Sequence, residues 1–176
     1  MHASLPAHFA ARTDPRAERG RNHPVLTVLT IALCAVIGGA DSWVEVVQFG
    51  KAKREWFAGF LDLSHGIPSH DTFGNVFAAL DPDQFHACFL AWVQAAVERA
   101  VREHWGIENG LHWVLDVAFR ENECRVRVGH AAENFVVVRH LALHLLKGER
   151  TAKIGVGAKR LKAGWDAQYL RTVLAP

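Results

Sequence analysis

Hydrophobic positions in residues 22–97 recur with the spacing of helices, and nothing in this stretch alternates with a period of two. The run Val25–Ile37 is apolar nearly all round, which predicts a helix surrounded by other elements. Gly38-Gly39 is expected to end that helix. Ser42 precedes Glu45 by three residues, the spacing of a capping box, so a second helix should begin directly after Ser42.

Three more segments of this half are also expected to be helical. One covers about residues 51–61, a second is capped by Ser69, and a third begins at Asp81-Pro82, in the usual order of cap and proline. Short turns connect these segments. Residues 22–97 are therefore predicted to form a bundle of five helices.

The C-terminal half is predicted to be helical with one mixed segment. Val101–Val117 has a helical pattern, and Phe119–Val128 is polar enough for a short hairpin or a loop. Ala131–Leu146 is strongly amphipathic, which predicts a helix with one buried side. Lys159–Leu174 is expected to form two short helical turns broken at Gly164.

Composition and charge distribution narrow the classes of protein. Half of the 176 residues are hydrophobic and 22% are charged, which is typical of globular chains. Residues 1–98 hold 7 Lys/Arg against 10 Asp/Glu, whereas residues 99–176 hold 13 against 8, so the positive charge lies in the C-terminal half. The longest apolar run has 13 residues, fewer than the roughly 20 that cross a bilayer, so we expect no membrane association.

Two groups of basic residues are candidate contacts for DNA phosphates. One lies in residues 1–21, which are expected to form a polar arm, and the other lies near the C-terminus. A solvated basic surface without a ligand is the alternative. The candidates are Arg12, Arg16, Arg19, Arg21, Lys153, Lys159, Arg160 and Lys162.

One helical stripe carries residues that could bind a metal. His104, Glu108, His112 and Asp116 follow each other at intervals of four, so neighbouring pairs share a helix face. The stripe is about 18 Å long at 1.5 Å per residue, so its four members cannot hold one ion. A polar face held by Glu–His hydrogen bonds is the alternative.

The three cysteines are far apart, which argues against a disulfide framework or a zinc ribbon and favours a reducing, cytoplasmic setting. Cys34 and Cys88 lie in apolar runs and are expected to be small core residues.

Two segments of the chain resemble the DDE-type insertion-sequence transposases related to the H-repeat-associated proteins. The first resembles their associated N-terminal domain over about 80 residues. Its matching stretches are Asp14-Pro-Arg16, Arg19-Gly-Arg21-Asn-His23-Pro24, Ile31-Ala-Leu-Cys-Ala-Val-Ile-Gly-Gly-Ala-Asp-Ser-Trp43, Gly66-Ile-Pro-Ser-His-Asp-Thr-Phe-Gly74 and Phe89-Leu-Ala-Trp-Val93.

The second segment resembles the C-terminal end of the same transposases. Its matching stretches are His104-Trp105-Gly-Ile-Glu108-Asn109, Gly129-His-Ala-Ala-Glu-Asn134 and Lys159-Arg-Leu-Lys-Ala-Gly-Trp165. The resemblance implies that Glu108 corresponds to the third catalytic carboxylate, a ligand of Mg²⁺ in the intact family. The motifs that carry the two catalytic aspartates of the family do not occur in this sequence. An internal deletion between about residues 97 and 102 accounts for both matches.

The resemblance implies a mainly α chain with a polar arm at 1–21, a transposase-associated helical domain at 22–98 and a helical remnant at 99–176. The remnant would come from an RNase H-like core whose central sheet is missing. Without that sheet, apolar side chains that it would cover are expected to be exposed, namely Trp105, Trp113, Val117 and Phe119.

The implied function is that of a DDE transposase relative that lacks catalysis and productive Mg²⁺ binding, because one carboxylate cannot hold the two metal ions that phosphodiester transfer uses. Such a chain would keep affinity for DNA at insertion-sequence ends. Alternatives are a regulatory module that binds a full-length transposase, a homo-oligomer, a small helical metal-binding protein built on the His104–Asp116 stripe, or a decaying reading frame without a function.

Overall fold

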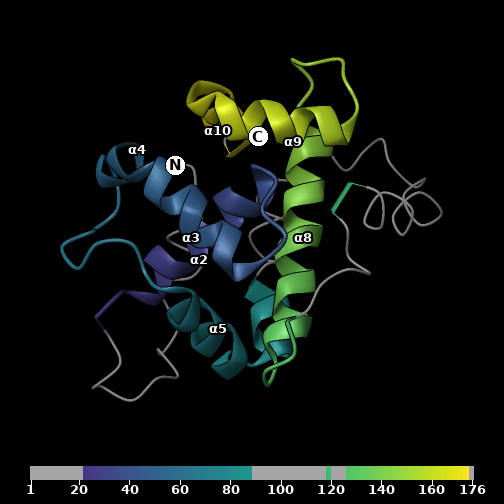
Figure 1. Ribbon diagram of the computed structural model, residues 1–176. Coiled ribbons are helices and arrows are strands. Elements are labelled where there is room, and N and C mark those ends of the chain that lie inside the picture. Colours follow the sequence, from purple (N-terminus) through teal and green to yellow (C-terminus); the bar gives the residue numbers. More distant parts are fainter. Residues whose placement is uncertain (1–21, 89–117, 120–125, 175–176) are drawn as a thin grey trace.

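The computed structural model describes residues 22–88, 118–119 and 126–174 (Figure 1). Their regular elements are helices, and no strand occurs among them, so the prediction of a mainly α chain is confirmed. The expected helix at 101–117 and the arm at 1–21 lie outside the described residues. The derivation of the C-terminal part from an RNase H-like core stays a prediction.

Helix α2 (Val25–Ile37) is the centre of the molecule, with the helices around it visible in Figure 1. Every side chain from Thr27 to Ile37 is buried, as the apolar pattern predicts. The helix ends where Gly39 adopts a positive φ of 107°, and the amide of Ala40 donates to the carbonyl of Ala35 at 2.9 Å. This is a Schellman motif, in which glycine takes the left-handed position at little steric cost.

Helix α3 (Trp43–Ala52) begins with the predicted capping box. The hydroxyl of Ser42 accepts the amide of Glu45 at 3.3 Å, and the carboxylate of Glu45 accepts the amide of Ser42 at 3.0 Å. A second helix follows as expected, but it is shorter than the predicted 51–61: α3 continues to Ala52, Lys53 has a non-helical ψ of 22°, and α4 covers Arg54–Ala58.

Helix α5 (His70–Ala79) starts as predicted, since the hydroxyl of Ser69 accepts the amide of Thr72 at 3.2 Å. Residues 82–88 are helical as well, and Asp81 caps them through the amide of Gln84 at 2.8 Å. Local capping chemistry therefore sets both helix starts.

Helix α8 (Ala131–Gly148) runs along both α2 and α5 and confirms the amphipathic pattern. The side-chain amide of its fully buried Asn134 donates to the carbonyls of Phe77 and Leu80, at 2.7 and 2.9 Å. These carbonyls end α5 and have no partner within that helix, so Asn134 supplies the bonds they would otherwise lack.

Helices α9 (Val156–Trp165) and α10 (Ala167–Leu174) lie across the C-terminal end of α8 (Figure 1). The break between them is at Asp166, whose carboxylate accepts the amides of Gln168 and Tyr169 at 2.9 and 3.0 Å. The predicted break at Gly164 is wrong. Gly164 instead permits close packing, since a Cβ there would lie 2.7 Å from the carbonyl oxygen of Gly38.

One hydrophobic core joins helices from both halves of the chain. Trp43 packs against Phe77 with ring centroids 4.7 Å apart and against Phe135 of α8 at 4.5 Å. Leu170 and Val173 of α10 belong to the same buried cluster as α2. The segment after residue 126 is therefore held by the N-terminal helices, while the expected domain boundary at 98–99 lies outside the described residues.

Phe119 departs from the expectation of an exposed patch, because its side chain is fully buried. The guanidinium of Arg160 lies 4.0 Å from its ring centroid and covers it. Trp105, Trp113 and Val117 lie outside the described residues.

None of the described helices is both long enough and apolar enough to cross a membrane.

Candidate functional site

The predicted site residues fall into two groups. Glu108, its neighbours in the proposed metal stripe and the arginines of the arm lie outside the described residues, so their roles stay predictions. The four C-terminal cations, Lys153, Lys159, Arg160 and Lys162, lie on α9 or in the loop before it. The structure separates these four into two buried and two exposed residues.

Lys159 is buried at the C-terminal end of α8. Its ammonium donates to the carbonyls of Leu146, at 2.9 Å, and of Glu149. It also forms an ion pair with the Glu149 carboxylate at 3.3 Å, and both side chains are less than a tenth exposed. The C-terminal end of a helix carries partial negative charge, so a cation at this position stabilises α8.

The carboxylate of Glu149 is ionised within this buried cluster. Burial alone would raise the pKa of Glu149, but hydrogen bonds from Thr151, from the Tyr169 hydroxyl and from backbone amides outweigh it and lower the pKa to about 2. The Tyr169 hydroxyl donates to this carboxylate at 2.6 Å. The negative charge of Glu149 is therefore matched inside the protein by Lys159.

Arg160 is likewise a buried cation that bonds a carbonyl at a helix end, here the end of α2, and a carboxylate. Its guanidinium donates to the carbonyl of Val36 at 3.0 Å and to the Asp41 carboxylate at 3.0 Å, and its side chain is 5% exposed. Burial lowers the pKa of Arg160, and the charge of Asp41 opposes this shift. Burial likewise raises the pKa of Asp41, against the attraction of Arg160. The two groups compensate each other's loss of water.

These contacts change the set of candidate DNA contacts. Lys159 and Arg160 are engaged within the fold, and their charges do not reach the surface, so their assignment as phosphate contacts does not fit the structure. The spacing of α9 gave no signal of this burial, because its apolar residues at helical intervals, Leu161 and Trp165, are exposed, whereas the buried face carries Lys159, Arg160 and Ala163.

Four exposed cations between the last turn of α8 and the last turn of α9 form what we call the basic end: Lys147, Arg150, Lys153 and Lys162. They lie on the last turn of α8, in the loop after it and on α9 (Figure 1). After His144 the acids are Glu149, which is buried, and Asp166, which is exposed and lies four residues after Lys162. The basic end therefore presents four positive charges beside one exposed carboxylate.

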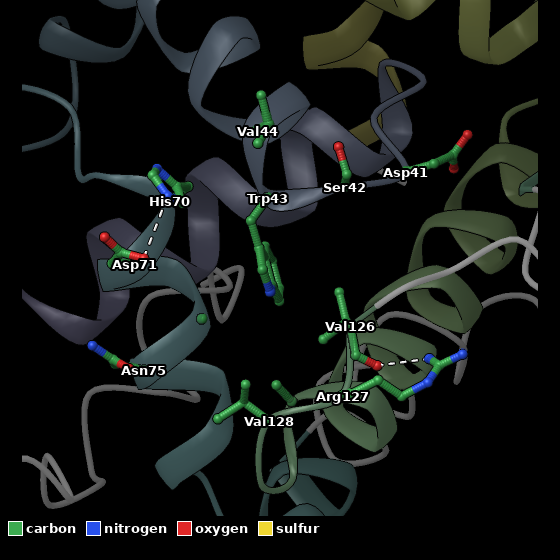
Figure 2. A pocket seen from close by; sticks show the side chains of 12 residues that line it. Asp41, Ser42, Trp43, Val44, His70, Asp71, Asn75, Val126, Arg127 and Val128 are labelled. Atoms are coloured by element: carbon green, nitrogen blue, oxygen red, sulfur yellow. Dashed lines mark hydrogen bonds and ion pairs between the residues drawn. The ribbon is translucent and has the colours of Figure 1, made fainter.

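A separate cleft of about 330 Å³ opens where three segments of the fold meet (Figure 2). The indole of Trp43 points into it from the start of α3, with α5 on one side and Val126–Val128 on another. Its polar groups include His70 and Asp71, whose nitrogen and oxygen lie 3.3 Å apart and are well exposed. The cleft is largely apolar and resembles a contact site more than a reaction centre.

A metal-dependent site does not emerge from the described residues. No group of three or more His, Cys, Asp or Glu side chains that could hold an ion occurs among residues 22–88, 118–119 and 126–174. Glu108, the Mg²⁺ ligand that the resemblance implies, lies outside the described residues, so its role stays a prediction. Cys34 is a buried core thiol whose pKa burial raises to about 12, as its apolar setting predicts.

Comparison with known proteins identifies the family. Residues 7–93 match the family described as DDE_Tnp_1-associated. The chain is also 32% identical over 72 residues to the inactive transposase YbfQ of Escherichia coli K12, and the match covers 86% of that protein. The chain belongs to the DDE_Tnp_1-associated family of transposase relatives. The resemblance of its N-terminal half is thereby confirmed.

Two other relatives are longer than this chain. An uncharacterized protein in the dhlA 3′ region of Xanthobacter autotrophicus is 49% identical over 89 residues, which are half of this chain and 30% of that protein. YncI of Escherichia coli O157:H7, named as a transposase, is 45% identical over 150 residues, or 85% of this chain and 38% of that protein. The chain thus spans about a third of the length of these two relatives.

The YncI match bears on the C-terminal half. A match of 150 residues cannot end before residue 150, so the likeness to this relative extends past residue 93 and includes α8. No solved structure matches the chain.

Proposed function

We propose that this chain is a non-catalytic transposase relative that binds DNA through the basic end. The observation that carries the proposal is the separation of charges around α9. Its two buried cations are neutralised by Glu149 and Asp41, while the four cations of the basic end stay on the surface beside a single exposed acid, Asp166. Phosphates would be attracted by these exposed charges and would release counterions on binding.

The start of α9 supports the same assignment. Its N-cap, Gly155, offers no side chain to the first amides of the helix, and added Cβ atoms at Gly155 and Gly157 would meet open space. Free backbone N–H groups at a helix N-terminus favour anions. Lys153 lies two residues before this cap, so positive charge and free donors are adjacent.

Salt dependence is the direct test of this binding. Fluorescence anisotropy of a labelled 30-base-pair duplex would be measured between 50 and 200 mM salt. Four phosphate contacts give a slope of log K against log salt of about −3.6, which is a loss of roughly 150-fold over this range. Contacts from the arm arginines would make the slope steeper. Affinity that does not change with salt contradicts the proposal.

A matched pair of double variants locates the contacts. Arg150→Ala with Lys153→Ala removes two charges from the basic end and should make the slope shallower by about two units. Lys51→Ala with Arg54→Ala removes two exposed charges from the α3–α4 region, with the same change in net charge. The proposal requires that only the first pair changes the slope, and equal effects would show that net charge alone governs binding.

The absence of catalysis is the second part of the proposal. It is supported by the missing aspartate motifs and by the likeness to a relative that is named an inactive transposase. Supercoiled plasmid incubated with the chain and Mg²⁺ or Mn²⁺ should show no nicking above buffer. Nicking that Glu108→Ala abolishes would overturn this part and leave the DNA-binding part intact.

A further inference from the structure

Helix α9 has a second, outward face that the hydrophobic core does not use. Ala158, Leu161 and Trp165 follow each other on α9 at intervals of three and four, and Ile154 lies in the loop just before the N-cap, Gly155. Leu161 is 58% exposed, Trp165 is 84% exposed and Ile154 is 46% exposed. We call these four residues the apolar stripe.

The core is already complete without the apolar stripe. The opposite side of α9 buries Lys159, Arg160 and Ala163 against the rest of the fold. An indole left 84% exposed is unusual, because tryptophan buries more surface than other side chains when it finds a partner. Contiguous exposed apolar groups mark sites of interaction.

The charges around the apolar stripe restrict its occupant. Lys153 directly precedes Ile154 and Lys162 directly follows Leu161, and both lysines are exposed members of the basic end. The nearest exposed acid, Asp166, accepts the amides of Gln168 and Tyr169 through its carboxylate, so its charge is partly engaged by α10. These charges favour an anionic occupant over a second copy of the chain, whose lysines would face their own counterparts. The exposed indole favours an occupant that offers flat apolar groups.

Single-stranded DNA meets both requirements. Its bases are free to stack on aromatic side chains while its phosphates bind nearby lysines. In duplex DNA the faces of the bases are covered by their neighbours, so only the phosphates would be available to the basic end. The rise from Ala158 to Trp165 is about 10 Å at 1.5 Å per residue, or roughly three bases at 3.4 Å each.

We infer that the apolar stripe is a stacking platform for single-stranded DNA, with the Trp165 indole as its principal contact. The inference rests on the proposed DNA binding and specifies the class of nucleic acid bound. Two sets of side chains have different roles in this binding. The basic end binds the backbone of any DNA, and the apolar stripe adds affinity where bases are unpaired.

The test compares two labelled probes, a 20-nucleotide oligo(dT) and a 20-base-pair duplex, by anisotropy at 100 mM salt with the full chain. Trp165→Ala should weaken binding of oligo(dT) by about 5- to 100-fold, the range expected for losing one stacked base. Duplex binding should change less than about twofold. Trp165→Phe keeps an aromatic face and should retain most of the affinity for oligo(dT).

Phe60→Ala is the matched control, since Phe60 is a half-exposed aromatic residue near α4, outside the stripe and the basic end. It should leave both affinities unchanged, with circular dichroism confirming that each variant is folded. Unchanged oligo(dT) binding in Trp165→Ala, or equal losses on both probes, would overturn the inference while duplex binding keeps the proposed function.

Two further outcomes would also overturn the inference that the apolar stripe binds single-stranded DNA. Failure of both probes to bind the unmodified chain would remove the proposed function together with the inference. If Trp165→Ala instead disperses a dimer in sedimentation velocity and leaves oligo(dT) binding unchanged, the stripe is a contact between protein chains and the inference is wrong.

Discussion

Arg160 of α9 binds the carboxylate of Asp41, 119 positions earlier in the chain, with 3.0 Å between nitrogen and oxygen. The same guanidinium bonds the carbonyl of Val36, one of the last carbonyls of α2. One side chain thus connects the C-terminal helices to the end of the central helix. It does so at the place where α2 turns into α3.

Loss of Arg160 should therefore destabilise the whole fold. Arg160→Met would leave the Asp41 charge without its partner and the carbonyl of Val36 with the Gly39 amide as its remaining donor, at a cost of about 3 kcal/mol. Urea unfolding followed by circular dichroism measures the change. Arg150→Met removes an exposed arginine from the neighbouring loop and should stay within about 0.5 kcal/mol. Similar values for the two variants would contradict the structural role of Arg160.

The buried carboxylate of Glu149 predicts a specific dependence of stability on pH. Its pKa of about 2 in the fold lies below its ordinary value of 4.5. A lowered carboxyl pKa adds stability that is complete above pH 4.5 and disappears as the pH falls to 2. Glu149→Gln should thus be less stable than the unmodified chain at pH 7, and this difference should shrink between pH 4.5 and 2. Urea midpoints at several pH values measure it, and a difference that does not vary with pH would rule out the ionised buried carboxylate.

Two glycines of α9 should respond to alanine in opposite directions. At Gly164 the new Cβ would lie 2.7 Å from the carbonyl oxygen of Gly38, so α9 would have to move away from α2, at a cost of about 1–3 kcal/mol. At Gly157 the Cβ meets open space, and alanine should stabilise the helix by up to about 1 kcal/mol. Thermal unfolding of both variants provides the comparison. Equal shifts would mean that α9 does not approach α2 closely at Gly164.

The parts of the fold that could be predicted from sequence are those with local causes. The bounds of α2 follow from an uninterrupted apolar run with glycines at its end, and the start of α3 follows from Ser42 and Glu45. The helix break at Asp166 was not predicted, because glycine is the more usual sign of a helix end and Gly164 lies two residues earlier. The true role of Gly164 depends on Gly38, which is far away in sequence.

The same reason explains why the burial of two predicted site residues could not be foreseen. Lys159 and Arg160 look like surface cations in a basic segment, and their burial depends on carbonyl groups at the ends of α8 and α2. A sequence shows that a cation is present but not which distant helix end accepts it. Lys153 and Lys162, the other two predicted contacts of this segment, are exposed. Their contact with DNA stays a prediction.

The aromatic contact between Trp43 and Phe135 offers a test of the shared core. Trp43 begins α3 and Phe135 lies on α8, with ring centroids 4.5 Å apart. Phe135→Ala should cost about 3–5 kcal/mol, because this fully buried ring leaves a cavity. In a double-mutant cycle with Trp43→Leu, the two changes should be coupled by about 0.5–1.5 kcal/mol, the range for aromatic pairs. Phe57 is equally buried but belongs to α4, so a cycle of Phe57→Leu with Phe135→Ala is the control and should be additive. Additive effects in both cycles would show that Trp43 and Phe135 do not pack against each other.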